Sequence, residues 1–126
     1  MTQRQTDIAI IGAGPQALTL VTHILQKKDK LRSRIQVFDP SGTWMSRWHQ
    51  QFAAQEIPQL RSPAVHHPDP NPHALRTFAE GRYPELHPPY DRPGTQLFQE
   101  FCATVIHRSQ LQEYVTPAQV TQLQPL

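Results

Sequence analysis

The feature that most constrains this chain is a glycine pair, Gly12 and Gly14, that directly follows a short apolar run. The run from Asp7 to Gly12 contains three isoleucines, which is typical of a strand buried on both faces of a parallel sheet. After Pro15 the apolar residues recur every three or four positions, which predicts an amphipathic helix with this proline in its first turn. A strand that passes through glycines into a helix indicates an α/β fold.

A second apolar run, from Ile35 to Phe38, follows a basic connection and ends at Asp39 and Pro40. It completes a strand–helix–strand unit over residues 7–40, which we predict to be the core of a Rossmann-type dinucleotide-binding fold with a parallel sheet. A chain of 126 residues is long enough for one hydrophobic core. We therefore assign residues 1–126 to a single dinucleotide-binding domain.

The glycines belong to a G-x-G-x-x-A pattern formed by Gly12, Gly14 and Ala17. In such a pattern the first glycine permits the tight turn, the second lets a pyrophosphate approach the backbone, and the small third residue lets the helix pack closely on the strand. The phosphates then meet the positive end of the helix dipole at its first turn, which here contains Pro15, Gln16 and Ala17. These five residues are the predicted phosphate site.

Asp39 stands where a carboxylate accepts hydrogen bonds from the two hydroxyls of a ribose, at the end of the second strand, and we count Asp39 and the adjacent Pro40 among the predicted cofactor-binding residues. Its separation from Gly12, 27 residues, is somewhat longer than the ~20 usual for this motif. A carboxylate would repel the 2′-phosphate of NADP, so Asp39 argues against NADP here. The choice between NAD and FAD stays open on these residues.

Residues 58–93 hold nine of the thirteen prolines, so any regular structure in this excursion must be short. Asn71 and Pro72 predict the start of a short helix that Gly81 would stop. Thr95 is the predicted cap of a longer helix with an apolar stripe facing the core. The segment 113–123 is predicted to form a strand pair, or a strand and a turn.

Composition narrows the class of protein. Twelve basic and ten acidic residues leave a formal charge of +2, from which we infer no nucleic-acid partner. The single cysteine, Cys102, excludes an internal disulfide and favours a reducing, cytoplasmic location. The chain start lacks the pattern of a signal peptide, and no apolar run approaches the ~20 residues of a membrane helix.

Two stretches, DIAIIGAGPQAL and IQVFDPSGTWMSRW, resemble the amino-terminal FAD-binding segment of flavin-dependent monooxygenases that N-hydroxylate lysine or ornithine, and of flavin-containing monooxygenases more broadly. The resemblance implies FAD as the cofactor. It also implies that Gly42, Thr43 and Trp44 pass under the flavin end, that Arg61 lies in the next cofactor-facing loop, and that Val120 contacts the adenine through its backbone.

The resemblance extends from Asp7 to Leu123, whereas members of these families continue with a second G-x-G-x-x-G for NADPH and a substrate-binding portion. We therefore expect an amino-terminal fragment of an oxidoreductase, not catalytically complete on its own, and we assign no catalytic residue. We expect the chain to associate with a complementing chain or with a second copy of itself. Two alternatives stay open: a non-catalytic remnant that binds a nucleotide or a protein, and an NAD-dependent dehydrogenase domain.

Other clusters of reactive side chains carry weaker signals. The histidines of the proline-rich excursion lack the spacing of metal ligands, so we predict no metal site. Cys102 lies on the apolar stripe and is not aligned with His107 for proton transfer. Trp44 and Trp48 would share one helix face and belong to the core if both were helical, but the resemblance makes Trp44 a wall of the cofactor site.

Overall fold

The computed structural model describes residues 5–126 and contains a three-stranded parallel sheet in which the second strand along the chain lies between the first and the last. The first four residues of the predicted domain thus lie outside the described residues. In the register of the sheet, Ile10 is paired with Val37, and Val37 with Val115. The chain therefore has the predicted α/β fold with a parallel sheet of Rossmann type. The strands are β1 (Ile8–Ile11), β2 (Ile35–Asp39) and β5 (Val115–Pro117).

The crossover from β1 to β2 is made by α1 (Pro15–Lys27) and the 3-10 helix η1 (Asp29–Arg34). The predicted strand–helix–strand unit is present, and Pro15 occupies the first turn of α1, where its missing N–H costs no hydrogen bond. Three side chains spaced by three and four residues bury the inner face of this helix: Leu18, Val21 and Leu25. Burial of this apolar stripe fixes α1 on the sheet.

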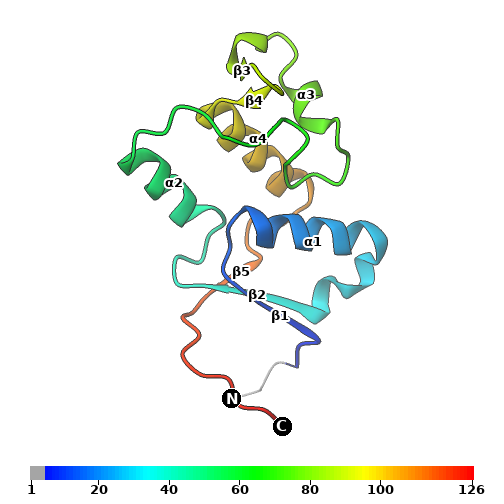
Figure 1. Ribbon diagram of the computed structural model, residues 1–126. Helices are drawn as coiled ribbons and strands as arrows, with labels where there is room; N and C mark the ends of the chain where they lie inside the picture. Colours follow the sequence, from blue (N-terminus) through cyan, green and yellow to red (C-terminus); the bar gives the residue numbers. More distant parts are fainter. Residues whose placement is uncertain (1–4) are drawn as a thin grey trace.

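The sheet is covered on one face only, which corrects the prediction that the first strand is buried on both faces. Ile10, Ile35 and Val37 point into the core and are at most 9% exposed, whereas Ile11 is 59% exposed. The four α-helices lie on one side of the sheet, and the carboxyl-terminal segment leaves on the other (Figure 1); besides α1 they are α2 (Ser46–Ala54), α3 (Ala74–Phe78) and α4 (Thr95–Arg108). Because side chains alternate along a strand, every second residue of β1 faces this open side.

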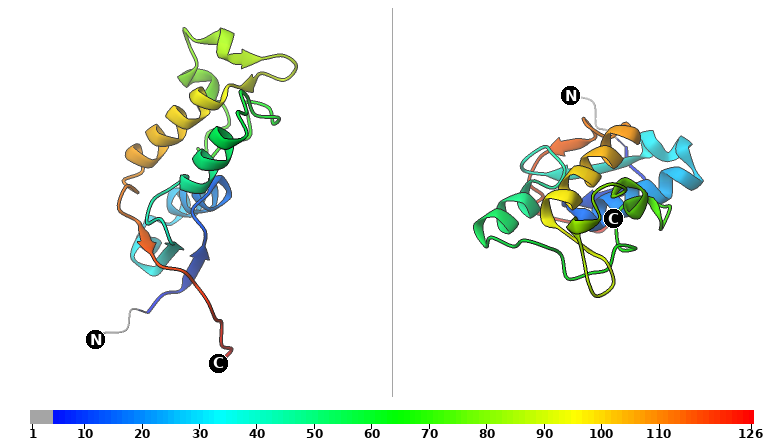
Figure 2. Two further views of the ribbon diagram at one scale, coloured as in Figure 1. Left: turned by 90° about the vertical axis from the view of Figure 1, so that its left-hand side faces the viewer. Right: turned by 90° about the horizontal axis from the view of Figure 1, so that it is seen from above.

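The proline-rich excursion contains only short elements, as predicted. They are α3 (Ala74–Phe78), the 3-10 helix η2 (Tyr83–Glu85) and the strands β3 (Leu86–His87) and β4 (Arg92–Pro93). The prediction that Asn71 and Pro72 start α3 is early by two residues, because the Asn71 side chain instead accepts a hydrogen bond from the His73 N–H in a turn before the helix. The β3–β4 hairpin lies at the end of the molecule opposite the carboxyl terminus (Figure 2).

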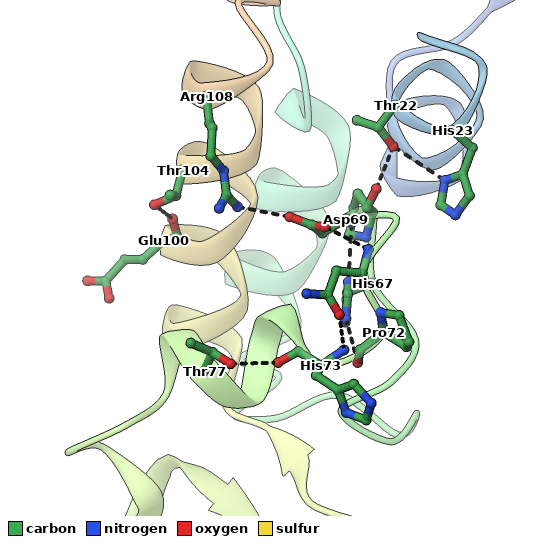
Figure 3. Close-up of polar contacts among 12 residues, drawn as sticks. Thr22, His23, His67, Asp69, Pro72, His73, Thr77, Glu100, Thr104 and Arg108 are labelled. Atoms are coloured by element: carbon green, nitrogen blue, oxygen red, sulfur yellow. Dashed lines mark hydrogen bonds and ion pairs between the residues drawn. The ribbon is translucent and has the colours of Figure 1, made fainter. Parts of the chain in front are cut away.

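The loop between α2 and α3 is held to two helices by polar contacts (Figure 3). The Thr22 hydroxyl on α1 donates to the Pro68 carbonyl at 2.5 Å, and Arg108 donates to Asp69 at 2.9 Å. His67 is 9% exposed, and its ring packs edge-on against Phe101. These contacts hold the loop in a defined position, although it has no regular secondary structure.

Helix α4 (Thr95–Arg108) follows the hairpin and buries the predicted apolar stripe. Gly94, not Thr95, occupies the cap position, because the Thr95 hydroxyl donates to the Ile57 carbonyl at 2.6 Å. Beyond α4 the structure forms β5 and then an irregular segment, so of the two predicted alternatives the strand pair is wrong and a single strand is present. α4 has 14 residues, and no helix in the described part of the chain is long and apolar enough to cross a membrane.

Candidate functional site

A pocket of about 280 Å³ opens at the carboxyl ends of β1 and β2 and is lined by four of the five predicted phosphate residues, all but Ala17, and by the predicted ribose residue Asp39. Ligands of open parallel sheets bind at this edge, because the strands there deliver loops that face a common crevice. We call this the polar pocket. Its lining residues are Gly12, Ala13, Gly14, Pro15, Gln16, Asp39, Ser46, Arg47, Trp48 and Gln51.

The glycine turn leaves space in the polar pocket that any larger residue would fill. A Cβ added to Gly12 or Gly14 would meet no heavy atom within 4 Å, so both positions border open space. Gly12 has a φ of +102° while its N–H donates to the Phe38 carbonyl at 2.8 Å, a backbone conformation that favours glycine. The turn therefore fits the close approach of a phosphate group, as the sequence predicts.

The amino terminus of α1 is available to an anion. The first turn has no acidic residue and no capping side chain, and the first hydrogen bond of the helix joins the Leu18 N–H to the Gly14 carbonyl at 3.0 Å. The N–H groups of Gln16 and Ala17 thus have no acceptor inside the helix, and they lie at its positive end. Ala17 itself is half-buried and packs against the core, in agreement with its predicted role beside the strand.

Asp39 lines the polar pocket with a carboxylate that Ser41 holds in place. Its Oδ2 accepts hydrogen bonds from the Ser41 N–H at 3.1 Å and the Ser41 hydroxyl at 2.5 Å. Oδ1 makes no hydrogen bond to any residue that the structure describes, and it is free to accept one from a hydroxyl of a ligand. Sequence reasoning found Asp39 but missed Ser41, which is recognisable as the residue that closes a local turn on a carboxylate.

The opposite wall of the polar pocket comes from α2 (Ser46–Ala54), an element that the sequence analysis did not predict. The Met45 N–H donates to the Ala13 carbonyl at 2.7 Å, which ties the start of this helix to the glycine turn. α2 also has no acidic residue in its first turn and no capping side chain. Ser46 and Arg47, both missed from the sequence, therefore border the pocket at a second helix amino terminus.

A second, larger pocket of about 630 Å³ adjoins the first and shares Pro15, Gln16 and Trp48 with it. We call it the aromatic pocket, because Trp48 and Phe52 stack with ring centroids 3.9 Å apart along one wall. Flat apolar walls of this kind suit a planar ring system. The remaining lining residues are Gln55, Ile57, Gln59, Leu60, Arg61, Ser62, His66 and Phe98, which include the predicted Arg61.

The structure places the other predicted cofactor residues outside these two pockets. Trp44 is only 6% exposed and lies in the core, where its indole N–H donates to the Leu111 carbonyl at 2.8 Å. A Cβ on Gly42, which has a φ of +70°, would approach Pro117 to 3.0 Å, so this glycine permits the contact with β5. Pro40 and Thr43 are exposed in the same turn, and Val120 is half-buried after β5.

The reactive side chains elsewhere do not form a second centre. In residues 5–126 no group of three or more histidine, cysteine, aspartate or glutamate side chains is arranged to hold a metal ion. Burial raises the pKa of the Cys102 thiol to about 12, and His107 is exposed and hydrogen-bonded to Gln112 at 2.8 Å. The thiol is therefore neutral.

Comparison with known protein families matches residues 9–125 to the family described as FAD-NAD(P)-binding. The matched range contains both pockets and the whole sheet apart from Ile8. Comparisons with curated proteins and with solved structures found no match.

Proposed function

This chain belongs to the FAD-NAD(P)-binding family, and from this premise we propose that the dinucleotide it binds is FAD. In this proposal the pyrophosphate lies at Gly12, Gly14 and the first turn of α1, and the adenosine ribose lies at Asp39. The flavin ring occupies the aromatic pocket beside Trp48. Bound FAD would supply the redox chemistry, while the chain binds and orients it.

The observation that carries the proposal is that the two pockets adjoin. A polar pocket that suits phosphates and a ribose lies next to an aromatic pocket of about 630 Å³, and the two share lining residues at the start of α1 and α2. FAD has the same two ends, an ADP portion and a large planar ring. NAD would place only a small nicotinamide ring against the stacked pair Trp48 and Phe52.

We further propose that the chain is the FAD-binding portion of a flavin-dependent oxidoreductase of the monooxygenase class. The support is the resemblance of residues 7–18 and 35–48 to those enzymes. No residue in the polar or aromatic pocket is assigned a catalytic role. A non-catalytic binding module and an NAD-dependent dehydrogenase domain are the alternatives that the experiment below separates from this proposal.

Association with another chain is part of the proposal. Parallel sheets are normally covered on both faces, and here β1 is an edge strand with Ile11 59% exposed on the open face. A complementing chain, or a second copy of this one, would cover that surface.

The test is the absorption spectrum of the purified chain after FAD has been added and the excess removed by dialysis. We expect about one flavin per chain in the wild type, and loss of bound flavin in Gly14→Trp, whose side chain would fill the polar pocket. Because a Cβ at Gly14 meets no heavy atom within 4 Å and its φ is −90°, this variant is expected to fold.

A control variant, Gln26→Trp, adds the same side chain to an exposed position near the end of α1 and should retain flavin. Circular dichroism checks the fold of both variants. A folded wild type that retains NAD but no flavin would establish the dehydrogenase alternative, and one that retains neither would leave the non-catalytic module. Oxidation of NADPH by the flavin-loaded chain alone would contradict the expectation that it is catalytically incomplete.

A further inference from the structure

Among the residues that line the polar pocket, Arg47 is the only cation. Its side chain is exposed and makes no ion pair with any residue from 5 to 126. By contrast, several arginines elsewhere in the chain are engaged: Arg34 with Asp7, Arg76 with Asp91, and Arg82 with Glu85. An arginine without an internal partner at the rim of a pocket is available to an anionic ligand.

A positive side chain would strengthen pyrophosphate binding in this pocket. The glycine turn and the first turn of α1 contain no lysine or arginine, and Asp39 adds a negative charge to the same pocket. The amino termini of α1 and α2 each supply only about half an elementary charge, whereas a pyrophosphate diester carries two full negative charges. The backbone alone therefore leaves part of the ligand charge unbalanced, and a cation on α2 can offset it.

We propose that Arg47 is a specificity-determining residue that binds the pyrophosphate and selects ligands with two 5′-phosphates over nucleosides. The inference rests on the proposed dinucleotide site and adds a residue that neither the motif nor the resemblance assigns. Guanidinium and phosphate form charge-assisted, bidentate hydrogen bonds, which are stronger than neutral ones.

The backbone places Arg47 suitably for this role. The hydrogen bond from Met45 to the Ala13 carbonyl, 2.7 Å long, fixes the first turn of α2 beside the glycine turn. Arg47 is the second residue of that helix, and it faces the pocket together with Ser46. The phosphates would thus lie between two helix amino termini, with Arg47 on one side and Gly14 on the other.

The experiment measures binding of ADP, adenosine and 2′,5′-ADP by titration calorimetry to the wild type, Arg47→Gln and Lys30→Gln. We expect Arg47→Gln to weaken ADP binding by about tenfold or more and to change adenosine binding by less than about twofold. Lys30→Gln removes one exposed positive charge from η1, which contributes no residue to the polar pocket, and should bind ADP like the wild type.

The remaining outcomes contradict different parts of the proposal. Unchanged ADP affinity in Arg47→Gln, or an equal loss for adenosine, overturns the role of Arg47. A loss confined to 2′,5′-ADP would place Arg47 at the ribose phosphate and overturn the pyrophosphate contact. A wild type that binds ADP but not FAD contradicts only the flavin part of the proposed function, whereas one that binds neither contradicts both.

Discussion

At the scale of single residues, the two tryptophans lie in different environments although they are only four positions apart in the sequence. Trp44 precedes α2 and points inward to Leu111, whereas Trp48 lies on the helix and lines both pockets. They do not share a helix face, because Met45 adopts a left-handed conformation with a φ of +67° and the helix begins only at Ser46. In the proposed FAD site, Trp48 therefore takes the position that the resemblance implies for Trp44.

We expect Trp44→Phe to lower the free energy of unfolding by about 1–3 kcal/mol, because the Leu111 carbonyl loses its buried donor. Flavin affinity should stay within about twofold. Trp48→Leu should reduce flavin affinity by about tenfold, because a stacking surface is lost, and it should lower the free energy of unfolding less than Trp44→Phe does. Urea denaturation and flavin titration measure the two effects. A larger loss of flavin binding in Trp44→Phe than in Trp48→Leu would restore the role that the sequence suggests for Trp44.

At the scale of elements, the loop that follows α2 is ordered by His67 rather than by regular structure. The Nδ1 atom of His67 accepts the Asp69 N–H at 3.2 Å, so its Nε2 carries the proton and donates to the Pro72 carbonyl, also at 3.2 Å. Burial lowers the pKa of His67, and nearby His23 and His66 act in the same direction, while Asp69 opposes them. Arg108 pairs with that carboxylate. The loop is therefore built around a neutral imidazole.

This arrangement predicts a loss of stability in mild acid. Because the pKa of His67 is lowered on folding, the unfolded chain binds a proton that the folded chain does not. The stabilisation is fully present above the unfolded value of ~6.5 and decreases as the pH falls below it. We expect the urea concentration at the unfolding midpoint of the wild type to be lower at about pH 5.5 than at about pH 7.5.

Two variants isolate the contribution of the loop. His67→Gln should show a smaller difference between the two pH values, whereas His107→Gln, at an exposed position on α4, should behave like the wild type. His49, whose pKa burial also lowers, accounts for a residual pH dependence in every variant. Equal pH dependence in His67→Gln and the wild type would show that the loop does not respond to this imidazole.

At the scale of the whole molecule, the helices pack on one face of the sheet and leave the other without a covering layer (Figure 1). Gln36 lies on this open face between Thr6 and Thr116, with side-chain hydrogen bonds of 3.0 and 3.2 Å. Beside this polar row, Ile11 exposes an apolar surface at the end of the edge strand. An exposed apolar side chain on an edge strand, whose outer edge has no neighbouring strand, favours association with another chain.

We expect the purified chain to self-associate, with a mass above that of the 14.5 kDa monomer in light scattering. Ile11→Glu should shift the population toward monomer, because a carboxylate in a buried interface is costly. Leu20→Glu is the matched control, since Leu20 is also exposed, at 48%, but lies on α1 away from the open face. A monomeric wild type at all concentrations would contradict this prediction.

Much of the fold was predictable because its signals are local. The strand, the glycine turn, the helix with Pro15 at its start and the acid at the end of the second strand each follow from adjacent residues, and the structure brings Gly12, Gly14 and Asp39 into one pocket. The apolar stripe of α4 was also visible as a helical period. The one-sided burial of β1 was not, because the hydrophobicity of a strand does not reveal what covers it.

The residues that were missed depend on tertiary structure. Ser46, Arg47 and Trp48 enter the polar pocket only because α2 begins where the Met45 N–H meets the Ala13 carbonyl. No local pattern announces that hydrogen bond. The burial of Trp44 likewise depends on Leu111, a residue 67 positions away.

The position of the polar pocket in the sequence determines when its residues become available during protein synthesis. All its lining residues fall between Gly12 and Gln51, so it is assembled from one continuous stretch near the start of the chain. β5, by contrast, pairs with β2 only after more than 70 residues have intervened. Contacts between residues close in sequence form faster than those that close long loops. We therefore expect a nucleotide to find its phosphate site on a nascent chain before the last strand of the sheet has been made.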